Sequence, residues 1–393
     1  MNTLLMQGNR PVLEFNISEG YYKILDEKHL PFSLKGALKF YEEKESYTPK
    51  DIKYISAYAT NIYNTMISFL GNRTLVLSRA NAKKLYEAFK LEQKDDLLSR
   101  AKVSISCKAI SLLDNFWIKQ ENDPTRYEEV NVRHNSLNKA IAQIALHGDN
   151  LTLQGKPEAP EFTTNGGYPK AWHRDPDGSL WLYKLNDAQS TAKIEVMTSN
   201  LLDHMNVKHC HYENRSSRDE YVCACPLMSS DTLNILDGGD FCTYMQRNGI
   251  DPDQALQKQC PDDYYKMFIV DYLCSNPDRH LQNWGVYYNP ETMKIKGLHP
   301  LFDHNNAFDK DVMDNKDYGS HFLGKTLREN AFYAIKHTDF HFTAPITRDM
   351  FLTTRMYESF KERAEDLGLE LNKYIAPDED LDLEEDGFDL DEE

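Results

Sequence analysis

Apolar and polar positions divide the chain into three blocks with different periodicities. Residues 1–155 begin with strand-like alternation in PVLEFNI and continue with helical patterns over Lys50–Leu70 and Asn81–Phe89. The segment SLLDNFWIK predicts a buried turn or short strand. These patterns carry no recognisable set of catalytic side chains, so we interpret the first block as an N-terminal accessory α/β region.

The second block alternates in the manner of a β-sheet. Residues 155–162, GKPEAPEF, contain two prolines without periodicity and predict a linker. Lys170–Arg174 and Ser179–Leu185 predict the two strands of a hairpin around the turn DPDG. An amphipathic helix is expected over Ala192–Met205, and further strands are expected over Val207–Leu227.

The third block is mainly helical. Tyr264–Leu273 predicts a buried helix, which a polar loop and a strand at Ile295–Phe302 follow. Lys325–Lys336 and Arg348–Leu367 predict two more helices. The whole pattern predicts an α+β fold whose parts are an accessory region at 1–155, a strand-rich lobe at 156–227, a helical lobe at 228–376 and a tail at 377–393.

The tail carries most of the net charge. The chain has a formal charge of −17, and Asp378–Glu393 holds eleven acidic residues and no basic one. Such a segment buries too little apolar surface to offset its ordering entropy, so we expect it to be disordered. The rest of the chain is only mildly acidic, which argues against direct binding to the phosphate backbone of nucleic acids.

Neither membrane nor secretion signals stand out. The chain contains no run of about 18–20 apolar residues, and its start lacks the basic head and apolar core of a signal peptide. Seven scattered cysteines do not suggest a disulfide framework. We expect a cytoplasmic protein with no membrane attachment, although a secreted effector fits the same sequence.

The candidate chemistry lies in the loop NPDRHLQNWGV. Asp278 and Asn283 stand five residues apart in it, and Asp303 ends an apolar run in LFDHNNAF twenty residues later. Phosphoryl transfer requires one carboxylate that orients and deprotonates the acceptor hydroxyl, and an amide and a second carboxylate that hold Mg²⁺. Asp and Asn also cap turns and helices, so the Asp-x4-Asn spacing alone would be a loop feature.

A lysine and a glutamate upstream strengthen this interpretation. Lys184 stands on the alternating strand SLWLYKLN, and Glu195 follows eleven residues later near the start of the predicted helix. A lysine on the inner face of a sheet is costly unless its charge is paired. A Lys–Glu pair of this kind positions ATP phosphates in kinases. The alternative is a surface lysine and an exposed helical acid.

The segment TTNGGYPK could cover the phosphates. Gly166 and Gly167 would let backbone N–H groups approach phosphate oxygens closely. The segment matches neither GxGxxG nor a Walker loop, and Asn-Gly-Gly is often no more than a turn.

Together, TNGGYPKAW, LWLYK, Glu195, DRHLQNWGV and LFDHNNAF resemble the bacterial HipA-like serine/threonine protein kinases over residues 160–340. The resemblance implies a two-lobed protein-kinase-like fold that uses ATP and Mg²⁺ to phosphorylate Ser or Thr of a protein. It implies that Asp278 is the base, that Asn283 and Asp303 hold the metal, and that Lys184 holds phosphate. It leaves the protein substrate unknown, and leaves room for an antitoxin or regulatory partner.

The resemblance also suggests autophosphorylation in the phosphate loop, with Thr163 and Thr164 as the candidate acceptors. Their alternative role is to cap the turn, as threonine often does. Cys225 and Leu227 are expected to line the strand and connection that face the adenine.

Other interpretations remain open. His209, Cys210, His211, Cys223 and Cys225 could form a zinc site, but HCH and CxC lack the usual CxxC spacing. The order DRH, rather than HRD, also occurs in phosphoinositide-kinase-like enzymes. A kinase that acts on a lipid or small molecule, or an inactive kinase fold that serves regulation or binding, are therefore the alternatives.

Overall fold

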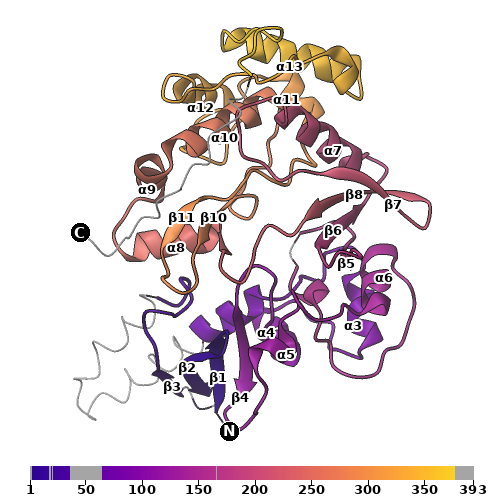
Figure 1. Ribbon diagram of the computed structural model, residues 1–393, viewed down its shortest axis with the longest axis vertical. Coiled ribbons are helices and arrows are strands. Elements are labelled where there is room, and N and C mark those ends of the chain that lie inside the picture. The colour runs from indigo at the N-terminus through magenta and orange to yellow at the C-terminus, as the bar shows by residue number, and fades with distance from the viewer. Residues whose placement is uncertain (1, 17–18, 20, 36–63, 165, 377–393) are drawn as a thin grey trace.

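The computed structural model describes residues 2–16, 19, 21–35, 64–164 and 166–376. This part of the chain contains three antiparallel sheets and a set of helices, so the expected mixture of helices and strands is confirmed. In the view of Figure 1 the N-terminal sheet lies at the bottom, the last helices lie at the top, and the other two sheets lie between them.

The N-terminal sheet has the strand order β3-β2-β1-β4. Leu5, Leu13 and Phe15 are buried against helix α4 and against a helix at residues 64–72. Only the end of the helix expected at Lys50–Leu70 is therefore described; the rest of that range lies outside the described residues. The expected strands in PVLEFNI and SLLDNFWIK are confirmed. The elements of this region are β1 (Thr3–Gln7), β2 (Arg10–Asn16), β3 (Tyr21–Ile24), α4 (Leu97–Ser106), β4 (Phe116–Gln120) and α5 (Tyr127–Val130).

The second sheet has the order β5-β6-β8-β7 and contains the expected hairpin. Because side chains alternate along a strand, its two faces differ in chemistry. Ala171, Tyr183 and Val222 pack on α3 and α6, which come from the first block of the sequence. The opposite face carries Lys184 toward α7. The elements are α3 (Ala82–Ala88), α6 (Lys139–His147), β5 (Lys170–Arg174), β6 (Leu180–Leu185), α7 (Thr191–Leu202), β7 (Glu213–Ser217) and β8 (Glu220–Pro226).

The sequence predicts a linker over residues 155–162, and this prediction is wrong for the second half of the segment. Residues Pro160–Phe162 form a short 3-10 helix, and Phe162 is completely buried. Its ring packs against Tyr86 and Phe89 of the first block. The prolines and the lack of periodicity could not show that an aromatic ring anchors this segment in the core. The proposed domain bounds at 155/156, 227/228 and 376/377 stay predictions.

The third sheet contains β9 (Asn234–Asp237), β10 (Gly285–Tyr288) and β11 (Ile295–Leu298), in the order β11-β10-β9. The strand expected at Ile295–Phe302 thus ends earlier. Beyond Leu298 the chain leaves this sheet, and Leu301 forms an isolated parallel bridge with His209 instead. This bridge carries the chain from the third sheet toward the second one just before Asp303.

Helix α10 lies at the centre of the last block, and all its residues from Tyr264 to Leu273 are buried, as expected. The helix expected over Arg348–Leu367 is interrupted, because Thr353 caps α13 by accepting a hydrogen bond from the Met356 amide. The elements are α8 (Gly238–Arg247), α9 (Pro252–Gln259), α10 (Pro261–Leu273), α11 (Lys310–Asp314), α12 (Leu327–Ala334), η2 (Arg348–Met350) and α13 (Thr354–Asp366).

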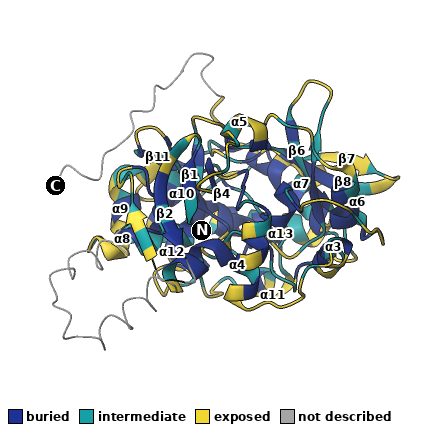
Figure 2. Ribbon diagram, turned by 90° about the horizontal axis from the view of Figure 1, so that it is seen from below, coloured by how far each residue is buried: buried dark blue, intermediate teal, exposed yellow. Residues whose placement is uncertain are grey.

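Burial follows this arrangement (Figure 2). The edge strand β7 has no fully buried residue, whereas most of its neighbour β8 is buried. Within the described residues, no helix combines the length and apolar character needed to cross a bilayer. All seven cysteines are free thiols. The tail at 377–393, for which disorder is expected, lies outside the described residues.

Candidate phosphoryl-transfer site

The centre of the candidate site is the ammonium group of Lys184. Its Nζ atom lies 2.7 Å and 2.9 Å from the two carboxylate oxygens of Glu195. The same Nζ lies 2.7 Å from Oδ1 of Asp303. One lysine therefore joins strand β6, helix α7 and the segment after the Leu301 bridge. These are three of the residues that the sequence singled out, and they meet in space.

Local structure explains why these side chains point inward. Lys184 follows Tyr183, which packs on the core of the opposite face, so alternation directs the lysine toward α7. Glu195 stands on the buried side of α7 and is 1% exposed. Asp303 has a left-handed backbone with φ of 60°, which an aspartate tolerates better than most residues.

The electrostatics of this trio favour a charged lysine and a charged aspartate. Burial opposes the charge of Lys184, but Asp303 and Glu195 raise its pKa well above the usual value. Burial acts to raise the pKa of Asp303, yet the charges of Lys184 and Lys170 hold that pKa below its usual range. Burial raises the pKa of Glu195 against the lowering effect of Lys184. A negative Asp303 is the form that can bind a cation.

The loop after α10 presents Asp278, whose side chain is 31% exposed. Its Oδ2 atom accepts a hydrogen bond of 2.7 Å from the Asn306 amide and a longer one of 3.4 Å from the Asn283 amide. Asn283 also donates to the backbone carbonyl of Asp278 at 2.7 Å. Two amides thus fix the orientation of a carboxylate that water, or a hydroxyl group, can still reach.

Arg279 connects the two loops, and sequence analysis did not single it out. Its Nη1 donates to the carbonyl of Asn283 at 2.5 Å and to the carbonyl of Phe302 at 2.8 Å. Its Nη2 donates to Asp271 at 2.9 Å. One guanidinium nitrogen therefore holds the backbone of Asn283 and the residue before Asp303 together. This places the two predicted metal ligands, one amide and one carboxylate, in the same neighbourhood.

The second nitrogen of Arg279 also contacts His304, with 2.8 Å between Nη2 and Nε2. Burial and the charge of Arg279 lower the pKa of His304 well below its usual value. The ring is therefore neutral, and its Nε2 accepts the hydrogen bond. This contact joins the arginine of the DRH motif to the histidine that follows Asp303. These two residues are the sequence signals from which the contact could have been inferred.

The donor set fits Mg²⁺, which prefers oxygen ligands and needs only one or two protein carboxylates beside phosphate and water. Asp303 supplies a charged carboxylate and Asn283 supplies an amide oxygen. Two residues after Asp303, the buried Oδ1 of Asn305 has no hydrogen-bond partner among the described residues. This oxygen is therefore an unpaired acceptor close in sequence to Asp303.

Lys170 is a second buried lysine at the site, and sequence analysis gave it no role. It pairs directly across the sheet with Lys184, and both are 5% exposed. Burial and the charge of Lys184 lower the pKa of Lys170 to about 8. The face of the sheet that carries Lys184 therefore holds two cationic groups, which only the strand register could reveal.

Residues of the first block form hydrogen bonds to the predicted phosphate loop. Arg79, which is 2% exposed, donates to the carbonyls of Glu161, Thr164 and Lys170. The Ala80 amide donates to the Gly167 carbonyl at 2.9 Å. Gly166 has a φ of 102°, a conformation that favours glycine. Residues of the first block therefore hold this loop in its conformation. Because that block lacks catalytic motifs, the sequence did not indicate this role.

The two threonines of this loop bind its own backbone. The hydroxyls of Thr163 and Thr164 donate to the Pro160 carbonyl at 3.2 Å and 2.7 Å. Thr164 also accepts a hydrogen bond from the Trp172 indole at 2.8 Å. Thr163 is only 6% exposed. In this conformation both hydroxyls cap the turn, which is the alternative role given above.

A tyrosine joins the phosphate loop to the segment after Asp303. The Tyr168 hydroxyl donates to the Asn306 amide oxygen at 3.3 Å, and the Asn306 amide nitrogen is the group that holds Asp278. The two residues stand in motifs 138 positions apart, and neither motif indicates that their side chains meet.

Cys225 and Leu227 stand at the end of β8. Cys225 is buried beside Tyr212 and Phe302, and burial raises the pKa of its thiol to about 11. The Leu227 amide donates to the Leu180 carbonyl at 2.8 Å. Cys225 thus shares an apolar cluster with Phe302, whereas Leu227 packs against a different cluster that contains Trp172 and Leu180.

The structure does not gather the five residues of the zinc alternative. Cys223 donates to a carboxylate oxygen of Glu195 at 3.5 Å, and Cys210 points to the Pro300 carbonyl at 3.9 Å. The two histidines of that set lie near Asp203 instead, away from the thiols.

Comparisons with known proteins add little detail. No protein-family model matches the chain, and no curated protein matches it. Among solved structures, the proinflammatory kinase CtkA of Helicobacter pylori is 12% identical, with a TM-score of 0.36 over 50% of this chain and 90% of that one. HipA of Shewanella oneidensis MR-1, in a toxin–antitoxin complex with HipB and operator DNA, is 13% identical. Its TM-score is 0.42 over 77% of this chain and 84% of that one. Both scores are low, so the site has to be judged by its own contacts.

Proposed function

We propose that the protein is an ATP- and Mg²⁺-dependent kinase of the HipA-like type, which transfers phosphate to Ser or Thr of a protein. The observation that carries this proposal is the simultaneous pairing of Lys184 with Glu195 and Asp303. Burying three charged groups is expensive, and replacing them with apolar residues would often be neutral or stabilising. Retaining them in contact is therefore better explained by chemistry than by stability.

The proposed mechanism gives each group one task. The Asp278 carboxylate accepts the proton of the acceptor hydroxyl as that oxygen bonds to the γ-phosphorus, and the bond from phosphorus to the β–γ bridging oxygen breaks to release ADP. Asn283 and Asp303 would hold the metal, which would neutralise charge on the phosphates. Lys184 orients the phosphates, while Glu195 keeps its ammonium in place.

The contact between Lys184 and Asp303 corresponds in this proposal to the state without nucleotide. Asp303 would exchange the ammonium for the metal, and Lys184 would exchange the carboxylate for phosphate oxygens. Both exchanges preserve a paired charge in a buried place, which avoids the cost of leaving an ion unpaired. Glu195 remains with Lys184 in both states.

The two-lobed arrangement is part of the proposal. Residues 156–227 would form the strand-rich lobe and residues 228–376 the helical lobe, with ATP between them. Gly166 and Gly167 would cover the phosphates, and Cys225 and Leu227 would face the adenine. Support comes from the order of elements along the chain, from the sheet that carries Lys184 to the α10 loop that carries Asp278. A cytoplasmic location and an antitoxin or regulatory partner belong to the same proposal.

Autophosphorylation at Thr163 or Thr164 is also proposed. Because both hydroxyls bind the Pro160 carbonyl, the loop would have to leave its present conformation before either could accept phosphate. A phosphate there adds a charge of about −1.5 to −2 beside the nucleotide, which would weaken ATP binding.

The test is transfer of labelled phosphate by the purified, untagged chain in the presence of Mg²⁺. The acceptors are a peptide mixture that contains Ser, Thr and Tyr, a lipid vesicle preparation and a mixture of small alcohols. We expect label on Ser or Thr peptides, identified by mass spectrometry, and none with Asp278→Asn. That variant should still bind Mg·ATP, because its side chain acts on the acceptor.

The other outcomes select the alternatives. Label on lipid or small alcohols alone would indicate a kinase with a different acceptor. Binding of Mg·ATP without any transfer or hydrolysis would indicate an inactive kinase fold. Near-normal transfer by Asp278→Asn would remove Asp278 from its proposed role.

A further inference from the structure

A second cluster of ligand-type side chains lies at the far end of helix α7. Asp203, which caps the C-terminus of this helix, and His209 and His211 of the following segment place one ligand atom each within 4.8 Å of one another. Nε2 of His209 lies 3.1 Å from Oδ1 of Asp203, and Nδ1 of His211 lies 3.3 Å from the same carboxylate. The proposed kinase chemistry uses none of the three.

The geometry of His209 is unusual for a simple ion pair. Its side chain is 9% exposed. Its Nε2 atom makes no hydrogen bond with any described residue, although a carboxylate oxygen lies 3.1 Å away. The two atoms are therefore close without being aligned for a hydrogen bond. An unsatisfied buried nitrogen costs free energy, so this arrangement requires an explanation.

Coordination of one metal ion by the three ligand atoms would explain this arrangement. Donor atoms about 2.0–2.1 Å from a tetrahedral zinc ion stand roughly 3.3 Å from one another. Oδ1 of Asp203 lies 3.1 Å from Nε2 of His209 and 3.3 Å from Nδ1 of His211, which agrees with such an edge length. The other ring nitrogen of His209, Nδ1, lies 3.5 Å from the Val207 carbonyl. A contact of this kind orients a ligating imidazole and leaves Nε2 as the metal-binding atom.

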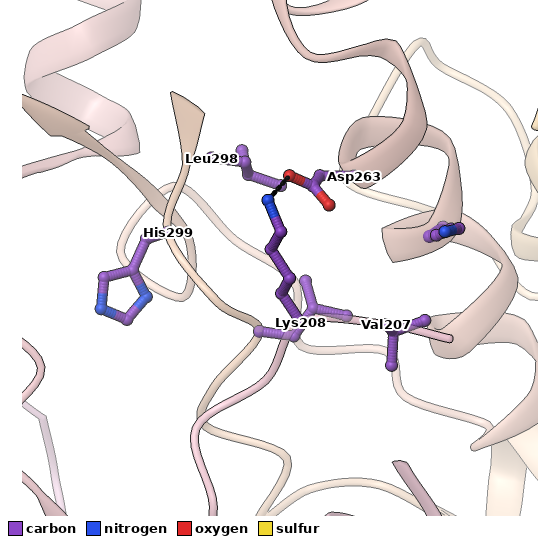
Figure 3. A pocket seen from close by; sticks show the side chains of 7 residues that line it. Val207, Lys208, Asp263, Leu298 and His299 are labelled. Atoms are coloured by element: carbon purple, nitrogen blue, oxygen red, sulfur yellow. Dashed lines mark hydrogen bonds and ion pairs between the residues drawn. The ribbon is translucent and has the colours of Figure 1, made fainter. Parts of the chain in front are cut away.

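Side chains alternate along residues 207–209, so the side chain of Lys208 points away from this cluster. Lys208, between Val207 and His209, points the other way and pairs with Asp263 at 3.4 Å across a cavity of about 10 Å³ (Figure 3). Its ammonium group therefore does not neutralise Asp203. The cluster keeps one carboxylate and two imidazoles, without a thiol.

We propose that Asp203, His209 and His211 bind one divalent transition-metal ion of the zinc class, with water as the fourth ligand. Two imidazoles and one carboxylate suit Zn²⁺ and its neighbours rather than Mg²⁺ or Ca²⁺, which prefer oxygen ligands. The ion would tie the end of α7 to the segment that bridges Leu301. The site is independent of the zinc alternative that included cysteines, and of the kinase proposal.

The test is metal binding by the full, untagged chain after treatment with a chelator and without nucleotide. Zn²⁺ is titrated in competition with a zinc indicator, and Co²⁺ is added separately as a spectroscopic probe. We expect one equivalent of Zn²⁺ per chain, and Co²⁺ visible bands of a tetrahedral nitrogen–oxygen site. Zn²⁺ should also raise the melting temperature, because a ligand that binds only the folded state stabilises it.

The variants locate the site. Asp203→Asn keeps the shape of the side chain, and His211→Ala removes an imidazole that is 53% exposed, so both should fold. Each should lose at least tenfold in Zn²⁺ affinity, and the Zn²⁺-dependent shift in melting temperature should disappear. If His211→Ala fails to fold, Asp203→Asn alone decides the test. His134→Ala is the matched control, because that imidazole pairs with Asp231 alone and lies 65% exposed.

Any one of four results would overturn the proposal. The first is the absence of Zn²⁺ binding by the wild-type chain. The second is equal affinity in the wild type and Asp203→Asn. The third is a strong near-ultraviolet band of Co²⁺–thiolate charge transfer, which would assign the metal to cysteines. Asp303→Asn must keep the site, because loss of Zn²⁺ there would assign it to the proposed Mg²⁺ ligands.

Discussion

The side chain of Lys170 passes through the space that Gly166 leaves open. A Cβ atom at position 166 would stand 2.2 Å from Nζ of Lys170. Gly166 also has a φ of 102°, so its backbone favours glycine, and an added Cβ would displace the end of the lysine side chain. The position of the Lys170 ammonium group thus depends on the loop glycine.

Replacing Gly166 should therefore disturb the site. Gly166→Ala adds about 1–2 kcal/mol of backbone strain and displaces the Lys170 ammonium group. We expect a lower melting temperature and a weaker affinity for Mg·ATP, measured by thermal unfolding and titration calorimetry. Gly167→Ala is the matched control for the melting temperature, since no atom lies within 4 Å of a Cβ there. Equal effects of the two substitutions would contradict a specific role of Gly166.

The titration of Lys170 should stabilise the folded protein as the pH rises above 8. Its folded-state pKa of about 8 lies below the usual value of 10.5, so between these values the unfolded chain binds more protons than the folded one. The free energy of unfolding of the wild type, relative to Lys170→Met, should therefore rise from pH 8 to pH 10. Denaturant titrations at several pH values measure this difference. A pH-independent difference would show that Lys170 keeps its proton throughout.

Rising pH should weaken nucleotide binding through the same lysine, although it increases the free energy of unfolding. Its charge attracts phosphate below pH 8 and is lost above it, so ATP affinity should fall between pH 7 and pH 9. Lys170→Met should bind more weakly at pH 7 and show a flatter pH profile. Parallel profiles for the two proteins would remove Lys170 from the nucleotide site.

Asp303 should matter more for the metal than for the nucleotide. Asp303→Asn removes the charge that holds Mg²⁺ but keeps the shape of the side chain. The affinity for Mg·ATP should fall by at least tenfold, whereas metal-free ATP should bind with little change, because Lys184 is also released from its carboxylate partner. Titration calorimetry with and without Mg²⁺ compares the two. Equal losses would argue against a metal role.

Arg279 should stabilise the fold as well as the site. Arg279→Met leaves the Asp271 carboxylate, whose side chain is 2% exposed, without its cation. Breaking such a buried pair from one side costs about 3–5 kcal/mol. Denaturant unfolding should show this loss, and the double variant Asp271→Asn/Arg279→Met should recover part of it. If the double variant is as unstable as the single one, the ion pair is not the cause.

Sequence patterns were most informative where a residue type and a spacing both carry meaning. Lys184 and Glu195 were expected to form a pair, and their side chains meet. The contact from Lys184 to Asp303 could not be predicted in the same way, since 119 residues separate the two. It depends on the bridge between Leu301 and His209, and the sequence patterns around these two residues do not indicate that they pair.

The roles of buried polar residues were hardest to predict. Lys170 and Arg79 appear in the sequence as ordinary basic residues, and only strand register and packing show that both are buried beside the site. Phe162 lies in a segment whose two prolines and lack of periodicity predict a linker, and that pattern contains no information on burial. Helices and strands were easier, because their periodicity directly reflects which face is apolar.

The contacts of Arg79 and Phe162 have a consequence for how the protein can be divided. A shortened chain that begins at residue 156 would expose the apolar face formed by Ala171, Tyr183 and Val222, and would lose the guanidinium that holds the glycine loop. Such a fragment would aggregate rather than fold. Limited proteolysis within residues 74–80 should therefore abolish the proposed kinase activity while leaving the proposed catalytic residues intact.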